Sequence, residues 1–396
     1  MRKIRLGIVF GGRSGEHEVS LQSAQSVMDA VDTDKYDVVP IGITKDGRWL
    51  ASGDPMRALT SGDPDASQPA ALLRSPGSTK VTESTKVTES TLSSVQNVQK
   101  GLMCLDESGE VIRATPLAEL DVVFPVLHGP YGEDGTVQGL LELAGLPYVG
   151  APVTASAVAM DKVIFKDVIR AHGLPTVEHV VVKRKRWESE PDNVLARIAD
   201  RFGYPLFTKP ANLGSSVGIT KCHDRAQLIA GLREAARYDR KLLVEPAVPA
   251  AREIEVSVLG NDAPVASLPG EIVPSREFYN YEAKYIDDGE EASDLLIPAP
   301  LSTEMTRRVQ NLAVETYRAI DCAGLARVDF LLSGETADLY VNEVNTIPGF
   351  TKISMYPKLW EASGLPYSEL IDRLIELALE RHRDKARTEI SYQPRE

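Results

Sequence analysis

The chain has 396 residues, which is more than one hydrophobic core organises, so two or three domains are expected. Hydrophobic residues make up 43% of the chain and charged residues 26%, the balance of a soluble globular enzyme. The net charge is -13, and the 44 lysines and arginines form no basic block. This argues against a protein that binds nucleic acid or a membrane surface.

The cysteines are few and scattered. Cys104, Cys222 and Cys322 have no CxxC spacing, which suits a reducing compartment and excludes a disulfide framework or a zinc site. Met1-Arg2-Lys3 leads into a strand without a signal-peptide core, and no apolar run reaches the 18 residues of a membrane span. A cytoplasmic protein is expected.

The N-terminal segment predicts the opening of a parallel α/β unit. Ile4–Phe10 is an apolar strand that ends at Gly11-Gly12, and a helix is expected from Ser20 to Val31. The ligand site of such a unit lies at the carboxyl ends of its strands. The turn GGRSGE does not fit GxGxxG, and no acidic residue closes a second strand, so a dinucleotide site is disfavoured.

A histidine stands at the same predicted sheet edge as Glu16. After a strand at Tyr36–Ile43, a later strand at Asp121–Leu127 ends in His128 and a glycine-rich loop. A lone histidine is more often structural, but this position is equally compatible with a functional one.

Two segments are expected to lie outside the folded core. Residues 61–100 are of low complexity and repeat STKVTE at 78–83 and 84–89, which predicts a surface insertion without an assigned function. The charged tail from Arg381 to Glu396 is expected to fray.

The middle of the chain has features of an anion site. One continuous helical stretch is expected at Ala155–His172, with Lys162 and Lys166 one turn apart. The strand Leu206–Pro210 carries Lys209, and the Gly/Ser loop Ala211–Gly218 follows it. Small loop residues let backbone N–H groups approach phosphates, although any tight hairpin would use the same residues. The Walker pattern is absent.

Two acids flank a proline-containing connector. The strand Lys241–Glu245 and the strand Glu253–Leu259 could enclose an adenine and a ribose, or they could form an ordinary domain hinge. The aromatic and charged segment Phe278–Ile286, followed by an acidic run, is typical of a lid.

The most informative pattern is a predicted β-hairpin, Ala326–Leu332 and Leu339–Asn345. With a side-chain period of two, one strand presents Arg327 and Asp329 on one face, and the other presents Glu343 and Asn345. Oxygen ligands without His or Cys suit a hard cation such as Mg²⁺ shared with phosphates. A salt-bridge lattice is the alternative.

Taken in order, these motifs resemble the D-alanine–D-alanine ligases of the ATP-grasp superfamily. The residues that carry the resemblance are GGRSGEHEVS, HGPYGEDG, MDK, KPANLGSSVG, YNYEAKY, RVDF and NEVNTIPGFT. The resemblance implies an α/β fold, with α+β character in the ATP-grasp portion. An N-terminal Rossmann-like parallel sheet at 1–150 would precede a central domain at 151–245 and a C-terminal domain at 246–396.

The resemblance also implies a reaction and its cofactors. ATP would phosphorylate a first D-alanine, and a second D-alanine would attack the D-alanyl phosphate to give D-alanyl-D-alanine for peptidoglycan. Two Mg²⁺ or Mn²⁺ ions would be held by Asp329, Glu343 and Asn345. The partners are these small molecules, without nucleic acid or membrane, and a homodimer is expected.

The family's functional residues transfer as follows. ATP would be bound by Lys162, Lys209, Ser215, Ser216, Glu245, Glu253 and Lys284. The first D-alanine would contact Glu16 and His128, the second Ser354 and Met355, and Arg327 with the N–H of Gly349 would hold the oxyanion. Glu16, Ser215 and Tyr285 match a trio that closes the lid. Pro246 departs from the lysine that many relatives carry there.

Three other functions were weighed. An ATP-grasp ligase with another acceptor, such as D-lactate, is the nearest. A Rossmann-type oxidoreductase would leave Asp329, Glu343 and Asn345 without a role. A non-catalytic nucleotide-binding regulator would not need Arg327 together with all three acid and amide side chains.

Overall fold

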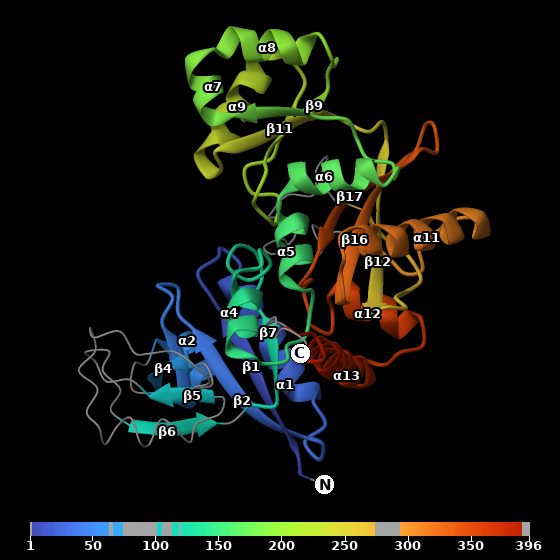
Figure 1. Cartoon of the computed structure of the whole chain (residues 1–396). Helices are drawn as coiled ribbons and strands as arrows, with labels where there is room; N and C mark the ends of the chain where they lie inside the picture. The colour runs from blue at the N-terminus through green and yellow to red at the C-terminus, as the bar shows by residue number, and fades with distance from the viewer. Residues whose placement is uncertain are drawn as a thin grey trace, which may run out of the picture. The chain divides into compact units, whose positions relative to one another are not determined.

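The computed structural model describes residues 2–62, 66–73, 101–104, 113–118, 120–273 and 294–389 (Figure 1). Contacts divide the chain into two compact units. The first contains Met1–Gly150, Gly349–Lys352 and Pro366–Glu396, and the second contains Ala151–Pro348 and Ile353–Leu365. The three predicted domains stay a prediction, because compactness alone does not test where a domain begins.

The described strands of the first unit form one seven-stranded sheet in the order β6-β5-β4-β3-β2-β1-β7. Only β2, β1 and β7 pair in parallel, and the other strands continue as an antiparallel meander. The strands are β1 (Ile4–Gly11), β2 (Tyr36–Ile43), β3 (Trp49–Gly53), β4 (Ser67–Leu73), β5 (Gly101–Cys104), β6 (Arg113–Ala118) and β7 (Val122–Val126). The predicted parallel sheet is therefore confirmed for its β2-β1-β7 part.

Part of the predicted low-complexity insertion belongs to this sheet. Strand β4 lies within residues 61–100 and pairs with β3 and β5. Its sequence SQPAALL is the apolar part of that segment, and pairing satisfies its backbone groups. The STKVTE repeats lie outside the described residues.

Helices cover both faces of the sheet in the first unit. They are α1 (His17–Ala30), α2 (Pro55–Ser61), α4 (Thr136–Ala144) and α13 (Tyr367–Lys385). Helix α4 packs Val137 and Leu141 against Val9 and Val123. Because Ile8 and Phe10 alternate with Val9 and are also fully buried, the opposite face needs a cover of its own. Helices α1 and α13 contact each other and β7 there.

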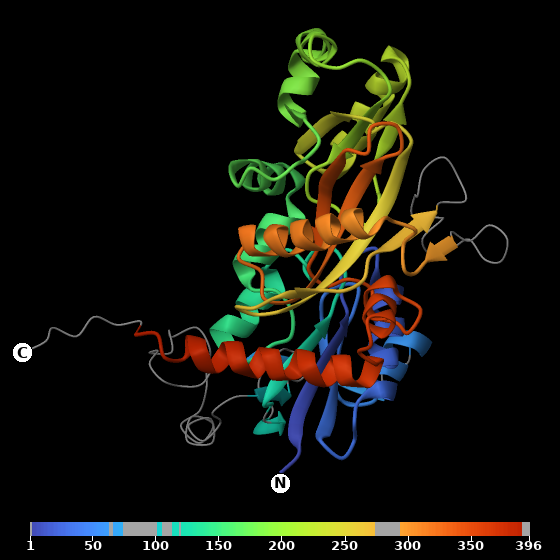
Figure 2. The ribbon, with the colours of Figure 1, turned by 90° about the vertical axis from the view of Figure 1, so that its right-hand side faces the viewer.

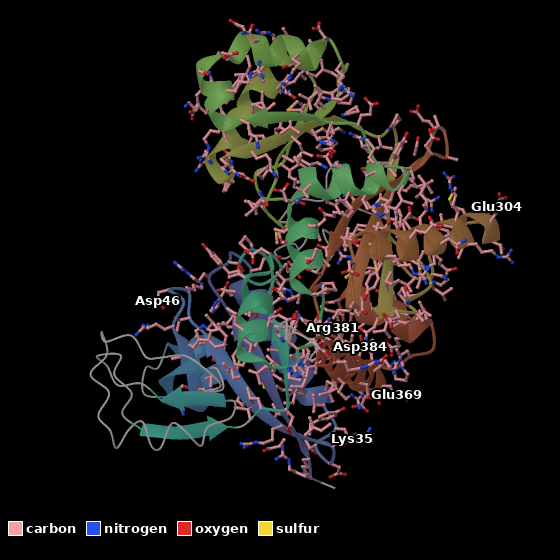
Figure 3. All side chains as sticks on the ribbon, viewed as in Figure 1. Lys35, Asp46, Glu304, Glu369, Arg381 and Asp384 are labelled. Carbon is pink, nitrogen blue, oxygen red and sulfur yellow. The ribbon has the colours of Figure 1, made fainter. Side chains whose placement is uncertain are left out.

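The C-terminal helix is longer than the sequence pattern indicated. Helix α13 continues to Lys385, so the expectation of fraying from Arg381 onward is wrong for these residues (Figure 2). Arg381, labelled in Figure 3, donates to the carbonyl of Gly150 and, at 2.9 Å, to that of Tyr148. Its guanidinium also lies 4.6 Å from the centre of the Tyr148 ring. These contacts anchor the last turns of the helix.

The second unit contains a four-stranded antiparallel sheet in the order β10-β9-β11-β8. Its strands are β8 (Val180–Lys183), β9 (Leu206–Pro210), β10 (Thr220–Cys222) and β11 (Lys241–Pro246). Three helices bury their apolar sides on it, and these are α7 (Arg184–Ser189), α8 (Pro191–Ala199) and α9 (Arg225–Tyr238). The first and last of the predicted strands around the Gly/Ser loop are thus confirmed.

The other sheet of this unit has six strands in its described part, in the order β15-β14-β12-β16-β17, with β13 beside β12. The strands are β12 (Ala251–Gly260), β13 (Val265–Ala266), β14 (Gly270–Val273), β15 (Asp294–Leu296), β16 (Gly324–Ser333) and β17 (Leu339–Asn345). The helices that accompany it are α5 (Val153–Met160), α6 (Lys162–Ala171), α11 (Thr303–Ala319) and α12 (Met355–Ala362). Strands β16 and β17 pair antiparallel, which confirms the predicted hairpin.

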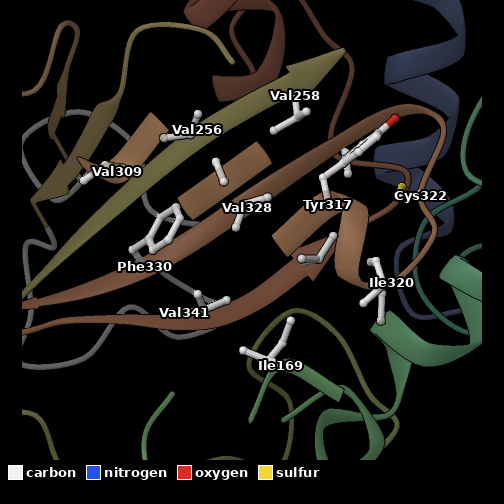
Figure 4. Packing of buried hydrophobic residues seen from close by; sticks show 14 of the residues in the cluster. Ile169, Val256, Val258, Val309, Tyr317, Ile320, Cys322, Val328, Phe330 and Val341 are labelled. Carbon is white, nitrogen blue, oxygen red and sulfur yellow. The ribbon is translucent and has the colours of Figure 1, made fainter. Parts of the chain in front are cut away.

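Alternation along these strands separates a core face from a polar face. Val256 lies opposite Val328, and both join Phe330, Val341 and Tyr317 of α11 in one buried cluster (Figure 4). The side chains between them point to the other face. A β-bulge after Asp329 keeps this separation along β17.

The predicted continuous helix at Ala155–His172 is wrong in one respect, because it is broken at Asp161. This residue ends α5 and caps α6, accepting hydrogen bonds from the N–H groups of Val163 and Ile164 at 3.1 and 3.2 Å. Its carboxylate also pairs with Lys241 of β11. A capping aspartate satisfies backbone donors that a continuous helix would otherwise bond internally.

No helix in the described ranges is long and apolar enough to cross a membrane. Cys222 and Cys322 are buried thiols that form no disulfide.

The cap at Asp161 can be isolated with two variants. Asp161→Asn retains a capping side chain and Asp161→Ala does not, while both remove the ion pair with Lys241. We expect the alanine variant to unfold with a free energy lower than that of the asparagine variant by about 1 kcal/mol. Urea unfolding of both proteins measures this difference, and equal stabilities would show that the cap contributes nothing.

Candidate functional site

A pocket of about 320 Å³ lies within the second unit, where both of its sheets supply residues. The four-stranded sheet contributes Lys209, Lys221 and Glu245, and the six-stranded sheet contributes Glu253, Glu255, Asp329 and Glu343. The Gly/Ser loop and the start of α6 complete the wall with Ser215, Ser216 and Lys162. The structure thus gathers charges from segments almost 200 residues apart in the sequence.

Two lysines of this region meet at one buried acid. Glu245 is only 2% exposed, Lys166 lies 3.0 Å from it, and Lys209 pairs with its other oxygen. Burial alone would raise the pKa of Glu245, but the two lysines outweigh burial and lower its pKa to about 2. Burial lowers the pKa of Lys166. Glu245 is therefore a carboxylate whose charge holds Lys166 and Lys209 in place.

A third lysine spans the pocket. The ammonium group of Lys162 donates to the carbonyl of Leu213 at 2.8 Å and lies 3.6 Å from Glu343. Because Lys162 is the first residue of α6, the Asp161 cap fixes where its side chain starts. The cation thus joins the Gly/Ser loop to the acidic face of the six-stranded sheet.

The Gly/Ser loop has an unusual backbone. Ser215 and Ser216 have φ angles of 49° and 58°, in the left-handed region that non-glycine residues rarely adopt. Such conformations cost about 1–3 kcal/mol each and concentrate at ligand sites. The loop is therefore consistent with a backbone shaped for a ligand rather than for a tight hairpin alone.

Three carboxylates form a row across the polar face of the six-stranded sheet. Glu255 of β12 lies opposite Asp329 of β16, which lies opposite Glu343 of β17. The neighbouring pair joins Arg327 to Asn345. The amide nitrogen of Asn345 donates to Asp329 Oδ2 at 2.8 Å, so its Oδ1 is the atom that it would offer to a cation.

Arg327 lies buried within this row. Its Nε and Nη2 atoms donate to the two oxygens of Asp329, both at 2.7 Å, and Nε also lies 2.9 Å from Glu255. Burial alone would lower the pKa of Arg327, but Asp329 and Glu255 outweigh it and raise the pKa well above its ordinary value. The guanidinium stays charged and its plane is fixed.

The first unit contains the other predicted substrate residues. Glu16 and His128 are both buried, at 9% and 4% exposed. Ser14 connects their loops by donating to the carbonyl of His128 at 2.6 Å and accepting from the N–H of Glu16 at 3.2 Å. A Cβ on Gly129 would stand 2.6 Å from the Glu16 carboxylate, so glycine is required there.

Gly349 belongs to the first unit through its neighbour Phe350. The Phe350 ring packs against Phe124 and Tyr367, with centroid distances of 5.5 and 5.6 Å. Its N–H donates to Ser23, whose hydroxyl also lies 3.1 Å from His128 Nε2. These contacts fix the backbone that follows Gly349.

Ser354 and Met355 start helix α12 in the second unit. Met355 is 6% exposed and packs with Ile272 and Leu359, so any contact of this residue with a ligand would use its backbone. An α-helix N-terminus favours an anion such as a carboxylate. The remaining predicted site residues, Lys284 and Tyr285, lie outside the described residues with the whole predicted lid.

Two family models match the chain. The model for the D-ala D-ala ligase N-terminus covers residues 5–151, and the model for the D-ala D-ala ligase C-terminus covers residues 168–376. The chain belongs to the D-alanine–D-alanine ligase family. The resemblance seen in the sequence motifs is thereby confirmed.

Relatives of this family match over the full chain. A D-alanine–D-alanine ligase of Natranaerobius thermophilus is 45% identical and covers 99% of both chains. One of Thermoanaerobacter sp. strain X514 is 50% identical and covers 98% of this chain and 99% of its own.

Solved structures of ligases match the fold. The D-alanine-D-alanine ligase from Coxiella burnetii has a TM-score of 0.77 and 36% identity, covering 98% of this chain and 97% of its own. The VanG D-Ala:D-Ser ligase from Enterococcus faecalis has a TM-score of 0.77 and 33% identity, covering 95% and 100%. The predicted mixed α/β fold with an ATP-grasp portion is confirmed.

Sequence reasoning missed two residues of this ligase site. Lys166 was open to interpretation as a solvated residue, yet it is 1% exposed and bound to Glu245. Glu255 was noted only as part of a strand, yet it contacts Arg327. The alternation of Glu253 and Glu255 puts both on one strand face and was the available signal.

The Lys166–Glu245–Lys209 cluster predicts a pH-dependent stability. The folded-state pKa of Glu245 is about 2 and its ordinary value is 4.5, which corresponds to about 3 kcal/mol. Because the folded pKa is the lower one, this stabilisation is present above pH 4.5 and is lost as the pH falls toward 2. Glu245→Gln should therefore be less stable than the native chain at pH 7, by a margin that shrinks between pH 4.5 and 3.

Urea unfolding at pH 7, 5, 4 and 3 measures that margin. Glu188→Gln, at an exposed position of α7, is the control and should follow the native chain at each pH. A Glu245→Gln margin that stays constant over this range would contradict the ion-pair account.

Proposed function

We propose that the protein catalyses the ATP-dependent ligation of two D-alanine molecules to D-alanyl-D-alanine, through a D-alanyl phosphate, for peptidoglycan precursor synthesis. One observation carries this function. Lys162 and Lys209 line the same pocket as Asp329 and Glu343, so phosphate-binding cations and cation-binding oxygens share one cavity. Relatives named as D-alanine–D-alanine ligases along the full length support the same activity.

The nucleotide is assigned to that pocket. Lys162, Lys209, Ser215 and Ser216 would hold the ATP phosphates through ammonium groups and through the hydroxyl and N–H groups of the loop. Glu253, on the pocket wall, would accept hydrogen bonds from the ribose. The predicted adenine contact of Glu245 stays a prediction, and its carboxylate already binds two lysines.

The oxygen row suits two Mg²⁺ or Mn²⁺ ions. Asp329, Glu343 and Asn345 offer only carboxylate and amide oxygens, the ligands that Mg²⁺ prefers. No cluster of three His, Cys, Asp or Glu side chains is preformed for a metal in the described ranges, so phosphate oxygens would complete the coordination. Bound there, the ions would neutralise charge on the transferred phosphoryl group.

The reaction has two steps. A carboxylate oxygen of the first D-alanine attacks the γ-phosphorus, the bond to the bridging oxygen breaks, and ADP leaves. The amine of the second D-alanine then attacks the acyl carbon and loses a proton, and inorganic phosphate leaves as the C–O bond breaks. The protein contributes mainly positioning and charge stabilisation.

Each unit supplies side chains for these steps. Arg327 and the N–H of Gly349 would stabilise the oxyanion of the tetrahedral intermediate. Glu16 would bind the ammonium group of the first D-alanine, with His128 beside it. The start of α12, at Ser354 and Met355, would receive the carboxylate of the second.

Three parts of the assignment remain predictions. The lid trio of Glu16, Ser215 and Tyr285, and the contact of Lys284 with ATP, need residues outside the described ranges. The homodimer and the cytoplasmic location are predictions from the sequence and the family.

The activity is tested by ADP formation that depends on D-alanine. With ATP and Mg²⁺, D-alanine alone should give ADP and the dipeptide, while added D-lactate or D-serine should leave the dipeptide as the main product across pH 6 to 9. A main product containing D-lactate or D-serine would replace the proposed acceptor. Absence of ADP formation with every acceptor would contradict the ligase function.

Glu343→Gln tests the metal assignment within this function. Loss of one carboxylate charge should lower kcat by roughly 100-fold or more, because an interaction with the developing phosphoryl charge is removed. The melting temperature should change little, since this side chain is 27% exposed. Glu335→Gln, at the exposed hairpin turn, is the control and should keep native rates.

A further inference from the structure

Arg327 has more carboxylate partners than its charge requires. One guanidinium stands between Asp329 and Glu255, both nearly buried, at 9% and 5% exposed. A buried carboxylate is costly to keep unless its charge is used. The second acid therefore calls for an explanation beyond charge neutralisation.

The hydrogen bonds to Asp329 identify a conflict. Its Oδ2 accepts from Arg327 Nη2 and from the Asn345 amide, and its Oδ1 accepts from Arg327 Nε. A carboxylate oxygen has about two lone-pair sites, so Oδ2 is fully engaged and Oδ1 has one site left. Coordinating a cation and holding Arg327 through both oxygens thus compete for the same atoms.

Glu255 is placed to resolve this competition. One of its oxygens lies 2.9 Å from Arg327 Nε, the same nitrogen that donates to Asp329 Oδ1 at 2.7 Å. The two acids face each other in register on adjacent strands, so both distances are set by the sheet. The Nε–H can pass from one carboxylate to the other without movement of the backbone.

We propose that Glu255 is a positioning residue that takes over the Arg327 Nε–H when Asp329 coordinates a divalent cation. The guanidinium then keeps its place and its orientation while Asp329 Oδ1 is released. This inference rests on the proposed function, because it assumes that Asp329 is a cation ligand. It predicts that Glu255 controls cation affinity without contacting the cation.

The chain offers a matched control on the same sheet. Glu271 of β14 is 6% exposed and pairs with Arg252 through two hydrogen bonds of 2.8 and 2.6 Å. Neither residue lines the pocket. Glu271→Gln therefore removes a similar buried Glu–Arg pair without touching the site.

The test compares Glu255→Gln, Glu271→Gln and the native chain by thermal unfolding with ADP at fixed concentration and Mg²⁺ at increasing concentration. Without Mg²⁺, both variants should have a lower Tm than the native chain. The Mg²⁺ concentration that gives half of the ADP-dependent Tm increase should rise about 10-fold or more in Glu255→Gln, as for other partners of metal ligands. It should stay unchanged in Glu271→Gln. The kcat for ADP formation should fall in the first variant only, and excess Mg²⁺ should partly restore it.

The outcomes separate the two claims. A native chain whose Tm does not respond to Mg²⁺ with ADP would overturn the metal assignment and this inference together. A native response with the same Mg²⁺ dependence in Glu255→Gln would overturn only the role of Glu255 and leave it as a structural charge. If Glu255→Gln does not fold, Glu255→Asp replaces it, because the shorter acid keeps the charge but draws back from Arg327 Nε. The same rise in half-saturating Mg²⁺ would support the inference, and native dependence would overturn it.

Discussion

A buried guanidinium between two carboxylates determines the polar face of the six-stranded sheet. Arg327 is held by Asp329 on its own strand and by Glu255 on the next, and Asn345 binds the same aspartate. Removing one partner from such a group leaves an uncompensated buried charge, which is strongly destabilising. The side chains assigned to the cation and to the oxyanion are therefore fixed before any ligand binds. Preorganisation of this kind is what charge stabilisation in a transition state requires, because no reorganisation is then needed during the reaction.

The same strand alternation builds the core and the site. Residues such as Val256 and Val328 pack under α11 on one face, and the acids between them line the pocket on the other. The facing wall from the four-stranded sheet is also charge-balanced, since Glu245 holds Lys166 and Lys209. Each set of charges is thus neutralised within the protein. An incoming triphosphate exchanges these internal partners for its own oxygens, which limits the desolvation cost of binding.

The sequence predicted the parts of this arrangement that depend on local patterns. Alternation and a turn were enough to find the hairpin that carries Arg327, and the ordered motifs were enough to identify the family. The partners of buried charges were not predictable, because Glu255 and Arg327 are 72 residues apart and burial is a property of the packed sheet. For the same reason Lys166 was compatible with a solvated face. Asp161 is different, since an aspartate inside a helical stretch was a visible capping signal that periodicity outweighed. Arg381 gained its helical position only through carbonyl partners on a distant loop.

The central claim is that oxygens of the six-stranded sheet hold the cations that bind ATP. Anomalous diffraction from crystals grown with Mn²⁺ and ADP tests it most directly, because manganese is located independently of the protein atoms. The account predicts manganese about 2.2 Å from oxygens of Asp329, Glu343 and Asn345, with ADP phosphate oxygens on the same ions. Nucleotide bound in the pocket with manganese absent from these three side chains would contradict it.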